Sequence, residues 1–313
     1  MTNKSQNQIF TDDEINFAEI LSVIWRGKWL VAIFITVAAI ISVSVSLLLD
    51  NEYTASATLY PSEQSSGGIS SLMKQYGGLA SLAGISLPSS SEGTSAQLGL
   101  ELLKSRAFIG EFVERRNILA ELMATESWDM LEDKIEFDPD IYDAKTGQWV
   151  REIDPPRVEK PSAIEAHEKF LEIMTVSEDS VSGYVTVSIT HKSPKLAAQW
   201  VTWLIEDLNE NVKAQEVNEA SKSIEYLTEQ VTTTSLRELQ AVFFELIQSQ
   251  TETVMLAEAR DEYVFKTLDP AVVPEEKSGP NRPLICIVGT LLGAAIGIIF
   301  VLIRHHRRQL QVS

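Results

Sequence analysis

The sequence LICIVGTLLGAAIGIIFVLI occupies residues Leu284–Ile303 and contains no charged side chain. At a rise of 1.5 Å per residue, a helix of about 20 residues crosses the ~30 Å hydrocarbon core of a bilayer. A second stretch of this kind, WLVAIFITVAAIISVSVSLLL, occupies Trp29–Leu49. The two stretches predict transmembrane helices over residues 29–49 and 284–303, with most of the remaining chain between them.

Basic residues flank the outer side of both stretches. Arg26 and Lys28 precede the first, and Arg304, Arg307 and Arg308 follow the second. By the positive-inside rule, the segments 1–28 and 304–313 are expected in the cytoplasm, and residues 50–283 across the membrane, which in a bacterium means the periplasm. A cleaved signal peptide is the rival interpretation of residues 29–49. It is disfavoured because the apolar run is longer than usual, starts late and is not followed by an A-x-A-like site.

The charge of the chain is concentrated between the two stretches. The whole chain carries −18, of which residues 1–28 carry −1 and residues 304–313 carry +3, so that −20 remains for the rest. A domain this acidic is not expected to bind nucleic acid or an anionic lipid surface by simple attraction. The only cysteine is Cys286, inside the second stretch, so the periplasmic domain has no disulfide.

The region 50–283 mixes strand and helix patterns, which predicts an α+β periplasmic domain. The β-branched and aromatic residues predict four strands, at Tyr53–Tyr60, Thr175–Ser177, Tyr184–Ile189 and Tyr263–Leu268. The first and last of these abut the two membrane stretches, so we expect them to pair in one membrane-proximal sheet. Helical spacing predicts helices over 95–116 and 118–123, and a third that starts with Pro161 at its first position and runs to Met174.

Three segments have a different character. Residues 61–95 are rich in Ser and Gly and predict a mobile loop, with a short helix over Ser70–Ala83. Residues 137–161 carry turn signals and predict a polar connector. Thr11–Glu14 is typical of a capping box at the start of a short helix that leads to the first membrane stretch.

The longest feature is a helical arm over about residues 194–260. Ser193-Pro194 is a cap followed by proline at the first helical position, and no Gly or Pro occurs from Lys195 to Asp269. Unbroken, the arm would be ~100 Å long. The β-branched run Val231–Ser235 is its weak point, and a kink or a helical hairpin there is the alternative. The predicted fold is therefore an α+β periplasmic domain with long extended helices, anchored by two transmembrane helices.

Patterns that carry catalysis are missing from this sequence. It has no G-x-x-x-x-G-K-[ST], G-x-S-x-G, H-E-x-x-H or C-x-x-C, and its four histidines are scattered. Carboxylate pairs such as Glu225/Glu229 are better explained by a solvated helix face than by acid–base catalysis. The acidic stretch 136–143 lacks EF-hand spacing, which disfavours a metal site. We therefore expect no enzyme activity, no catalytic residues, no metal and no cofactor.

Small residues form a stripe on each membrane stretch. In the second, Gly289, Gly293 and Gly297 recur every four residues and would let another helix approach closely. Ala38, Ser42 and Ser46 form a similar stripe in the first. The stripes predict a packing interface, either between the two spans of one chain or between protomers.

Aromatic residues on the arm allow a sugar-stacking hypothesis. Trp200, Trp203, Phe243 and Phe244 all lie there. At helical spacing, however, such residues are more typical of a core or a subunit contact.

The order of these features resembles the Wzz-type polysaccharide co-polymerases, the chain-length determinants of O-antigen and related bacterial surface polysaccharides. The resemblance covers essentially the whole chain. It rests on Asp13–Phe17 continuing to Trp25–Trp29, and on the strand that begins Tyr53-Thr54-Ala55. It is strongest at Asp269–Pro274 followed by Ser278–Pro283, where Pro280, Asn281, Arg282 and Pro283 form the family motif before the glycine-rich span. Residues Gly77–Gly84 are similar to a loop of the exopolysaccharide relatives.

The resemblance implies an inner-membrane protein that assembles into a ring-like homo-oligomer and sets the length of a polymer made by a Wzy-type polymerase. The growing lipid-linked polysaccharide is a further implied partner. An alternative is a kinase-partnered adaptor for capsule or exopolysaccharide export. Members fused to a kinase carry a Walker motif after the second span, and this sequence shows none. A two-span receptor would need a signalling module, and a periplasmic hydrolase would need a nucleophile–base pair.

Overall fold

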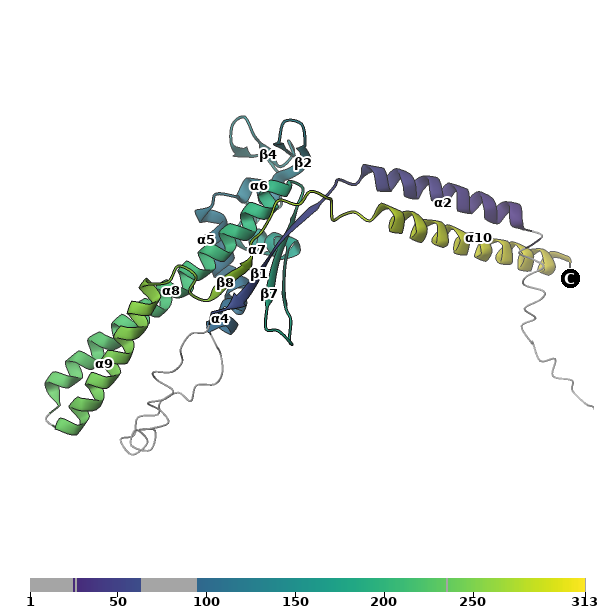
Figure 1. Ribbon diagram of the computed structural model, residues 1–313. Coiled ribbons are helices and arrows are strands. Elements are labelled where there is room, and N and C mark those ends of the chain that lie inside the picture. Colours follow the sequence, from purple (N-terminus) through teal and green to yellow (C-terminus); the bar gives the residue numbers. More distant parts are fainter. Residues whose placement is uncertain (1–24, 26, 63–94, 235, 313) are drawn as a thin grey trace, which may run out of the picture. The chain divides into compact units, whose positions relative to one another are not determined.

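The computed structural model describes residues 25, 27–62, 95–234 and 236–312 of the chain (Figure 1). They belong to two compact units, one made of residues 1–50 and 279–313 and the other of residues 51–278. The capping-box helix expected before the first span lies outside the described residues, as does most of the Ser/Gly-rich segment with its expected short helix.

Two long apolar helices form the first unit. Helix α2 spans Lys28–Leu48 and helix α10 spans Arg282–Val312, and they lie side by side (Figure 1). By length and composition, Lys28–Leu48 and Arg282–Arg304 are candidate membrane spans. Both helices predicted from the apolar runs are therefore present. The second begins two residues earlier than predicted and continues through the basic segment that follows it.

A four-stranded antiparallel sheet in the order β6-β7-β1-β8 lies in the second unit. Its strands are β1 (Tyr53–Pro61), β6 (Met174–Glu178), β7 (Val185–His191) and β8 (Phe265–Asp269). The alternate residues of β1, Tyr53, Ala55, Ala57 and Leu59, are buried, as expected for a strand with one face on the core. The predicted strands are confirmed, and so is the pairing of the first with the last.

Several helices share one hydrophobic core with the buried face of this sheet. They are α4 (Ser95–Leu103), α5 (Arg106–Arg115), α6 (Leu119–Ala124), α7 (Ala163–Ile173) and the first half of α8 (Pro194–Thr233). Phe112, Phe170 and Trp200 pack in this core with Leu59 and Val187, and each is at most 1% exposed. An α+β domain with long helices is therefore confirmed.

Two helix boundaries differ from the prediction because serine side chains cap helices. The helix predicted over 95–116 is broken at Ser105, whose Oγ accepts a hydrogen bond from Phe108 N (3.2 Å) and starts α5. Pro161 is not the first residue of α7. Ser162 caps that helix instead, through a capping box with Glu165, so the proline lies just outside it.

The arm is a helical hairpin rather than one unbroken helix. Helix α8 begins as predicted, with Ser193 as its cap and Pro194 at its start. It ends at Thr233, and α9 (Arg237–Glu258) returns alongside it (Figure 1). The Gln240 side chain donates hydrogen bonds to Val231 O (3.3 Å) and Thr234 O (2.8 Å), which satisfies carbonyls left free where α8 ends. The break therefore falls in the β-branched run named as the weak point.

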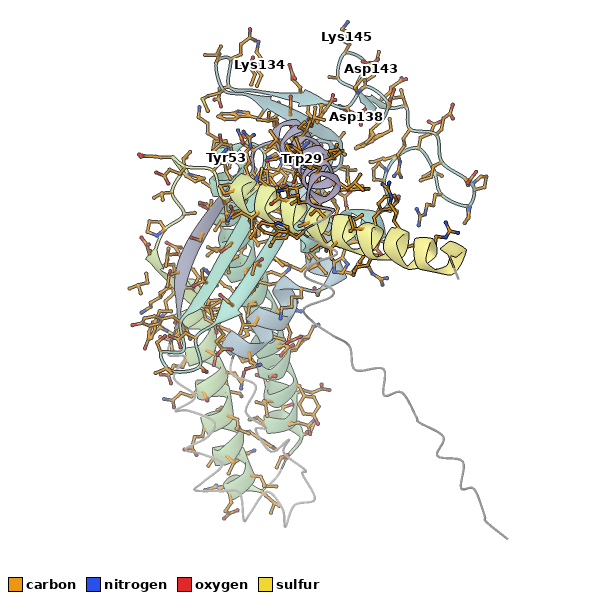
Figure 2. The ribbon with its side chains drawn as sticks, turned by 90° about the vertical axis from the view of Figure 1, so that its right-hand side faces the viewer. Trp29, Tyr53, Lys134, Asp138, Asp143 and Lys145 are labelled. Atoms are coloured by element: carbon orange, nitrogen blue, oxygen red, sulfur yellow. The ribbon has the colours of Figure 1, made fainter. Side chains whose placement is uncertain are left out.

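Two small hairpins were not predicted. One pairs β2 (Thr125–Asp129) with β3 (Lys134–Phe137), and the other pairs β4 (Tyr142–Asp143) with β5 (Gln148–Trp149), inside the segment expected to be a polar connector. Gly147 has a φ of +71° in the turn of the second hairpin, which explains glycine there. Figure 2 shows Lys134 on the first hairpin and Lys145 at the turn of the second.

Candidate functional site

The glycine stripe of α10 packs against α2 of the same chain. A Cβ atom added at Gly289 would overlap Ser42 Oγ, and one at Gly293 would overlap Ala38 Cβ and lie 3.1 Å from Phe34 O. At Gly297 it would lie 3.1 Å from Phe34 Cβ. The absent side chains therefore allow the two helices to approach closely.

The small residues of α2 meet this surface in register. Ser42 is 8% exposed and donates a hydrogen bond to Ile285 O (2.9 Å) on α10. Ser46 is 2% exposed. Of the two interfaces that the stripes allowed, the structure places these residues between the two spans of one chain.

The motif Pro280-Asn281-Arg282-Pro283 starts α10. The Asn281 side chain accepts a hydrogen bond from Leu284 N (3.3 Å) and its carbonyl accepts one from Ile285 N (3.1 Å), which is the geometry of a helix cap. Arg282 Nη2 lies 3.5 Å from Leu49 O at the end of the first span. The motif therefore fixes where the second helix begins and joins it to the end of the first.

A separate contact closes the periplasmic unit at its two chain ends. Ser278 N donates to Glu52 O (2.8 Å), and Ser278 Oγ donates to the same carbonyl (3.0 Å). Thr54 Oγ1 donates to Ser278 Oγ (2.8 Å). The chain thus enters and leaves this unit at one place.

His191 and two aspartates of the acidic segment hold a helix start and two turns through hydrogen bonds. Burial lowers the pKa of His191, whose Nδ1 accepts a hydrogen bond from Ser193 N (3.0 Å) at the start of α8. In the acidic segment, the Asp138 and Asp143 carboxylates accept hydrogen bonds from the turn amides of Asp140 and Lys145 (2.9 Å each). Within the described parts of the chain, no three His, Cys, Asp or Glu residues gather as a metal site would require.

The aromatic residues of the arm do not form one exposed platform. Trp200 is completely buried, against Phe170 and His191, whereas Phe244 is 60% exposed on α9. Trp203 is covered by the Arg116 guanidinium at 5.0 Å, and that guanidinium also pairs with Asp207 (2.7 Å). Trp200 therefore belongs to the core and Trp203 to an ion-pair cluster.

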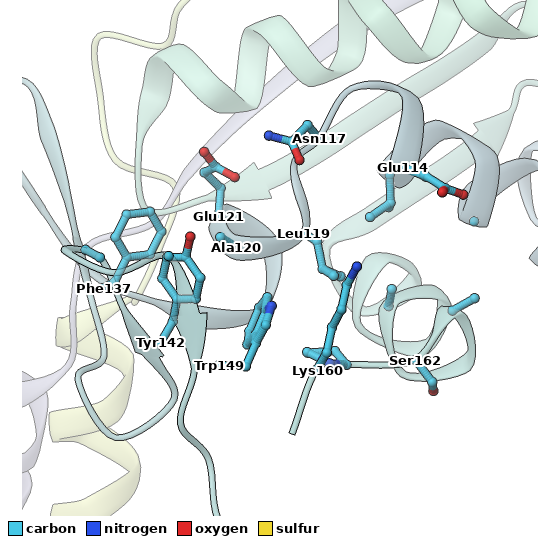
Figure 3. Close-up of a pocket in the computed structure, with 17 residues that line it drawn as sticks. Glu114, Asn117, Leu119, Ala120, Glu121, Phe137, Tyr142, Trp149, Lys160 and Ser162 are labelled. Carbon is cyan, nitrogen blue, oxygen red and sulfur yellow. The ribbon is translucent and has the colours of Figure 1, made fainter. Parts of the chain in front are cut away.

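A cleft of about 570 Å³ lies where the second hairpin meets α5, α6 and the start of α7 (Figure 3). Phe137, Tyr142 and Trp149 form its aromatic wall. The polar side chains that line it are those of Glu114, Asn117, Glu121 and Lys160. The sequence analysis missed this cleft, although three aromatic residues spaced along a polar segment were a visible signal.

An ion pair holds one side of the cleft in place. Arg151 Nη1 and Nη2 donate to the two carboxylate oxygens of Glu165 (2.9 and 3.0 Å), and Arg151 Nε donates to Glu159 O (2.6 Å). The bidentate contact with Arg151 lowers the pKa of Glu165 to about 2. The pair fastens the segment before Lys160 to the first turn of α7.

Two protein families match parts of this chain. Residues 13–115 match the family described as chain length determinant protein, Wzz, and residues 235–306 match the family described as G-rich domain on putative tyrosine kinase. No curated protein sequence matches the chain significantly.

Two solved structures align with it at low identity. One, described as a full-length bacterial polysaccharide co-polymerase, is 13% identical with a TM-score of 0.36 and covers 92% of this chain and 97% of its own. The other, a fragment of the polysaccharide co-polymerase WzzB from Salmonella Typhimurium, is 14% identical with a TM-score of 0.26 and covers 73% and 100%.

The family matches fall on the segments that carried the resemblance in the sequence. The first match extends from before the first span through β1 to the end of α5, and the second contains the proline-rich approach to α10 and its glycine stripe. Together with the two candidate spans, they indicate a two-pass inner-membrane protein with a periplasmic domain. Over residues 13–115 the chain is therefore similar to the Wzz-type family of chain length determinants.

Proposed function

We propose that this chain regulates the chain length of O-antigen, or of a related surface polysaccharide, that a Wzy-type polymerase makes. The family match over residues 13–115 carries the proposal. The basic residues outside both spans support an orientation with both termini in the cytoplasm and residues 51–278 in the periplasm.

The protein would act through binding surfaces. Large apolar side chains are exposed on the arm, among them Tyr226, Leu239 and Phe244 at 62%, 37% and 60%. Exposed apolar surface of this kind is typical of a protein interface and supports assembly into a ring-like homo-oligomer. In this mechanism the spans contact the polymerase, the periplasmic ring contacts the growing lipid-linked polysaccharide, and the geometry of the ring limits extension.

The first experiment is a deletion of the gene, with electrophoresis of the surface polysaccharide. We expect a ladder with a preferred length in the parent and a random length distribution in the deletion strain. A plasmid copy should restore the preferred length. An unchanged O-antigen ladder, with capsule and exopolysaccharide lengths also unchanged, would overturn the proposal.

A second candidate is a kinase-partnered adaptor for capsule or exopolysaccharide export. The observation that favours it is the match of residues 235–306 to a G-rich domain on putative tyrosine kinase. In that role, deletion would abolish export of a capsule or exopolysaccharide and leave the O-antigen ladder intact. Co-purification of a separate ATP-binding kinase with the tagged protein would then identify the partner.

A further inference from the structure

We propose that the cleft beside the second hairpin binds one sugar unit of the polysaccharide whose length the protein controls. The identity of this ligand rests on the proposed function, whereas the site itself rests on the geometry of the cleft. Its volume of about 570 Å³ lies within the range of small-molecule sites. Every residue that lines it belongs to the periplasmic unit, between Gly110 and Ala166.

The aromatic wall provides a surface for the C–H face of a pyranose ring. The ring centroids of Tyr142 and Trp149 are 5.0 Å apart, and those of Phe137 and Tyr142 are 5.3 Å apart, so the three rings form a continuous row. Figure 3 shows Tyr142 and Trp149 side by side along one side of the cleft. Broad aromatic faces stabilise apolar C–H groups by burial and dispersion while the hydroxyl groups at the sugar edge stay available.

The polar residues opposite this wall supply the matching hydrogen-bonding groups. Among the described residues, the side chains of Glu114, Asn117 and Lys160 have no hydrogen bond or ion pair within the protein. One carboxylate oxygen of Glu121, Oε2, is buried and has no hydrogen-bond partner among the described residues. Because protein atoms cover Oε2, a ligand in the cleft would meet Glu121 through the other carboxylate oxygen, Oε1, which can accept a hydrogen bond from a sugar hydroxyl.

The charge of the cleft selects a hydroxyl-rich ligand over other classes. Two carboxylates, Glu114 and Glu121, face one ammonium group, Lys160. Phosphate or a nucleotide would be repelled by the carboxylates, and an apolar peptide would leave these charged groups without partners. A neutral or amino sugar can donate to the carboxylates and accept from Lys160 and Asn117 at the same time.

Contacts outside the cleft hold the residues that line it in place. The Arg151–Glu165 pair fastens the segment before Lys160 to α7, and both side chains are only 14–15% exposed. Ile118, which joins α5 to α6 beneath the polar residues, is 4% exposed in the core. Because these residues are already held in place, little conformational entropy is lost when a ligand binds. This favours measurable affinity for a single sugar unit.

The test is a titration of the full-length protein in lipid nanodiscs. The probe is the surface polysaccharide of the producing cells, freed of lipid and cut by mild acid to oligosaccharides of one to four repeats. We expect saturation-transfer NMR and calorimetry to show binding to the parent, and Trp149→Ala to weaken it at least about tenfold, which corresponds to about 1.4 kcal/mol. Glu121→Gln changes a single polar group with little change in volume, and should weaken binding without unfolding the domain.

Two variants serve as matched controls. Val150→Ala changes an exposed residue next to Trp149 that does not line the cleft, and Val181→Ala shortens a 95% exposed side chain in the turn between β6 and β7. Both should bind as the parent does. Equal binding by the parent, Trp149→Ala and Glu121→Gln, or no binding by the parent, would overturn the proposed sugar site.

The outcomes separate this site from the proposed function. If gene deletion randomises polymer length but the parent binds no oligosaccharide, chain-length control stands and the sugar site falls. If deletion changes no surface polysaccharide, but the parent binds the oligosaccharides and Trp149→Ala weakens that binding at least about tenfold, the site stands and chain-length control falls.

Discussion

Asn209 joins the arm to the sheet through three buried hydrogen bonds. Its side-chain oxygen accepts from Val264 N (2.8 Å) and Phe265 N (3.0 Å), and its amide donates to Phe265 O (3.1 Å). The residue is 4% exposed. These bonds satisfy the backbone where the chain returns from α9 to β8.

Replacing Asn209 by Leu should strongly destabilise the periplasmic domain. The change leaves two buried N–H groups and one carbonyl without partners, and we expect a loss of about 3 kcal/mol in the free energy of unfolding. Denaturant unfolding followed by circular dichroism measures it. Asn218→Leu, at an exposed position nine residues further along α8, is the control and should cost less than about 0.5 kcal/mol.

Glu165 should make part of the stability depend on pH. Its pKa is lowered to about 2 by Arg151, so its contribution is complete above the ordinary carboxyl pKa and is lost as the pH falls towards about 2. Glu165→Gln keeps an acceptor for the capping box but removes the charge. We expect the variant to be less stable by about 1 to 2 kcal/mol near neutral pH, because some solvent screens the pair.

The measurement compares thermal unfolding of Glu165→Gln and the parent at about pH 7 and about pH 3. The difference between the two proteins should shrink at the lower pH. A difference that stays constant with pH would show that the Glu165 charge does not contribute.

The sequence predicted the regular elements of the fold better than its short ones. Runs of β-branched and aromatic residues predicted β1 and β7, and the Ser193-Pro194 pair located the start of α8, because these signals are local and strong. The hairpins β2–β3 and β4–β5 were not predicted because their strands are short and mostly polar. Such strands show no clear alternation of apolar and polar residues in the sequence. The break at Ser105 escaped because a serine inside an apolar helical pattern becomes a cap only through its contact with Phe108 N.

Of the two candidate sites, only the interface between the membrane helices was predicted from the sequence. A stripe of glycines has a periodicity that can be read from one segment of sequence. The cleft, by contrast, combines residues from α5, α6, two hairpins and the start of α7, and no periodicity joins Glu121 to Trp149. Sequence spacing does not bring these two side chains together; the packing of separate elements does.

The helix pair α2–α10 should tolerate large side chains poorly at its interface. Replacing Gly289, Gly293 and Gly297 by Leu forces bulk against Ser42, Ala38 and Phe34, and Gly293 is the most restricted because a backbone oxygen lies beside it. We expect the triple variant to be expressed but to lose control of polymer length, which electrophoresis of the surface polysaccharide will show.

Ala295→Leu is the control for the glycine variants. It adds the same side chain to an exposed position of α10 and should leave polymer length unchanged. A parental length distribution from the triple glycine variant would contradict a role for this packing in chain-length control.

The orientation of the whole chain can be tested with single cysteines in a Cys286→Ala background. Leu131 is 95% exposed in the β2–β3 turn, and Arg307 is exposed in the basic segment after the second span. With the outer membrane permeabilised, a membrane-impermeant maleimide should label Leu131→Cys in whole cells and Arg307→Cys only after lysis. The reverse pattern would contradict cytoplasmic termini.

The contact between Ser278 and Glu52 is useful for protein engineering. Because Ser278 N lies 2.8 Å from Glu52 O, the two ends of the periplasmic unit are neighbours. Residues 51–278 are thus a segment with adjacent ends, inserted in the chain between helices α2 and α10. Such a segment can be exchanged with that of a relative through two cuts that leave both membrane helices intact.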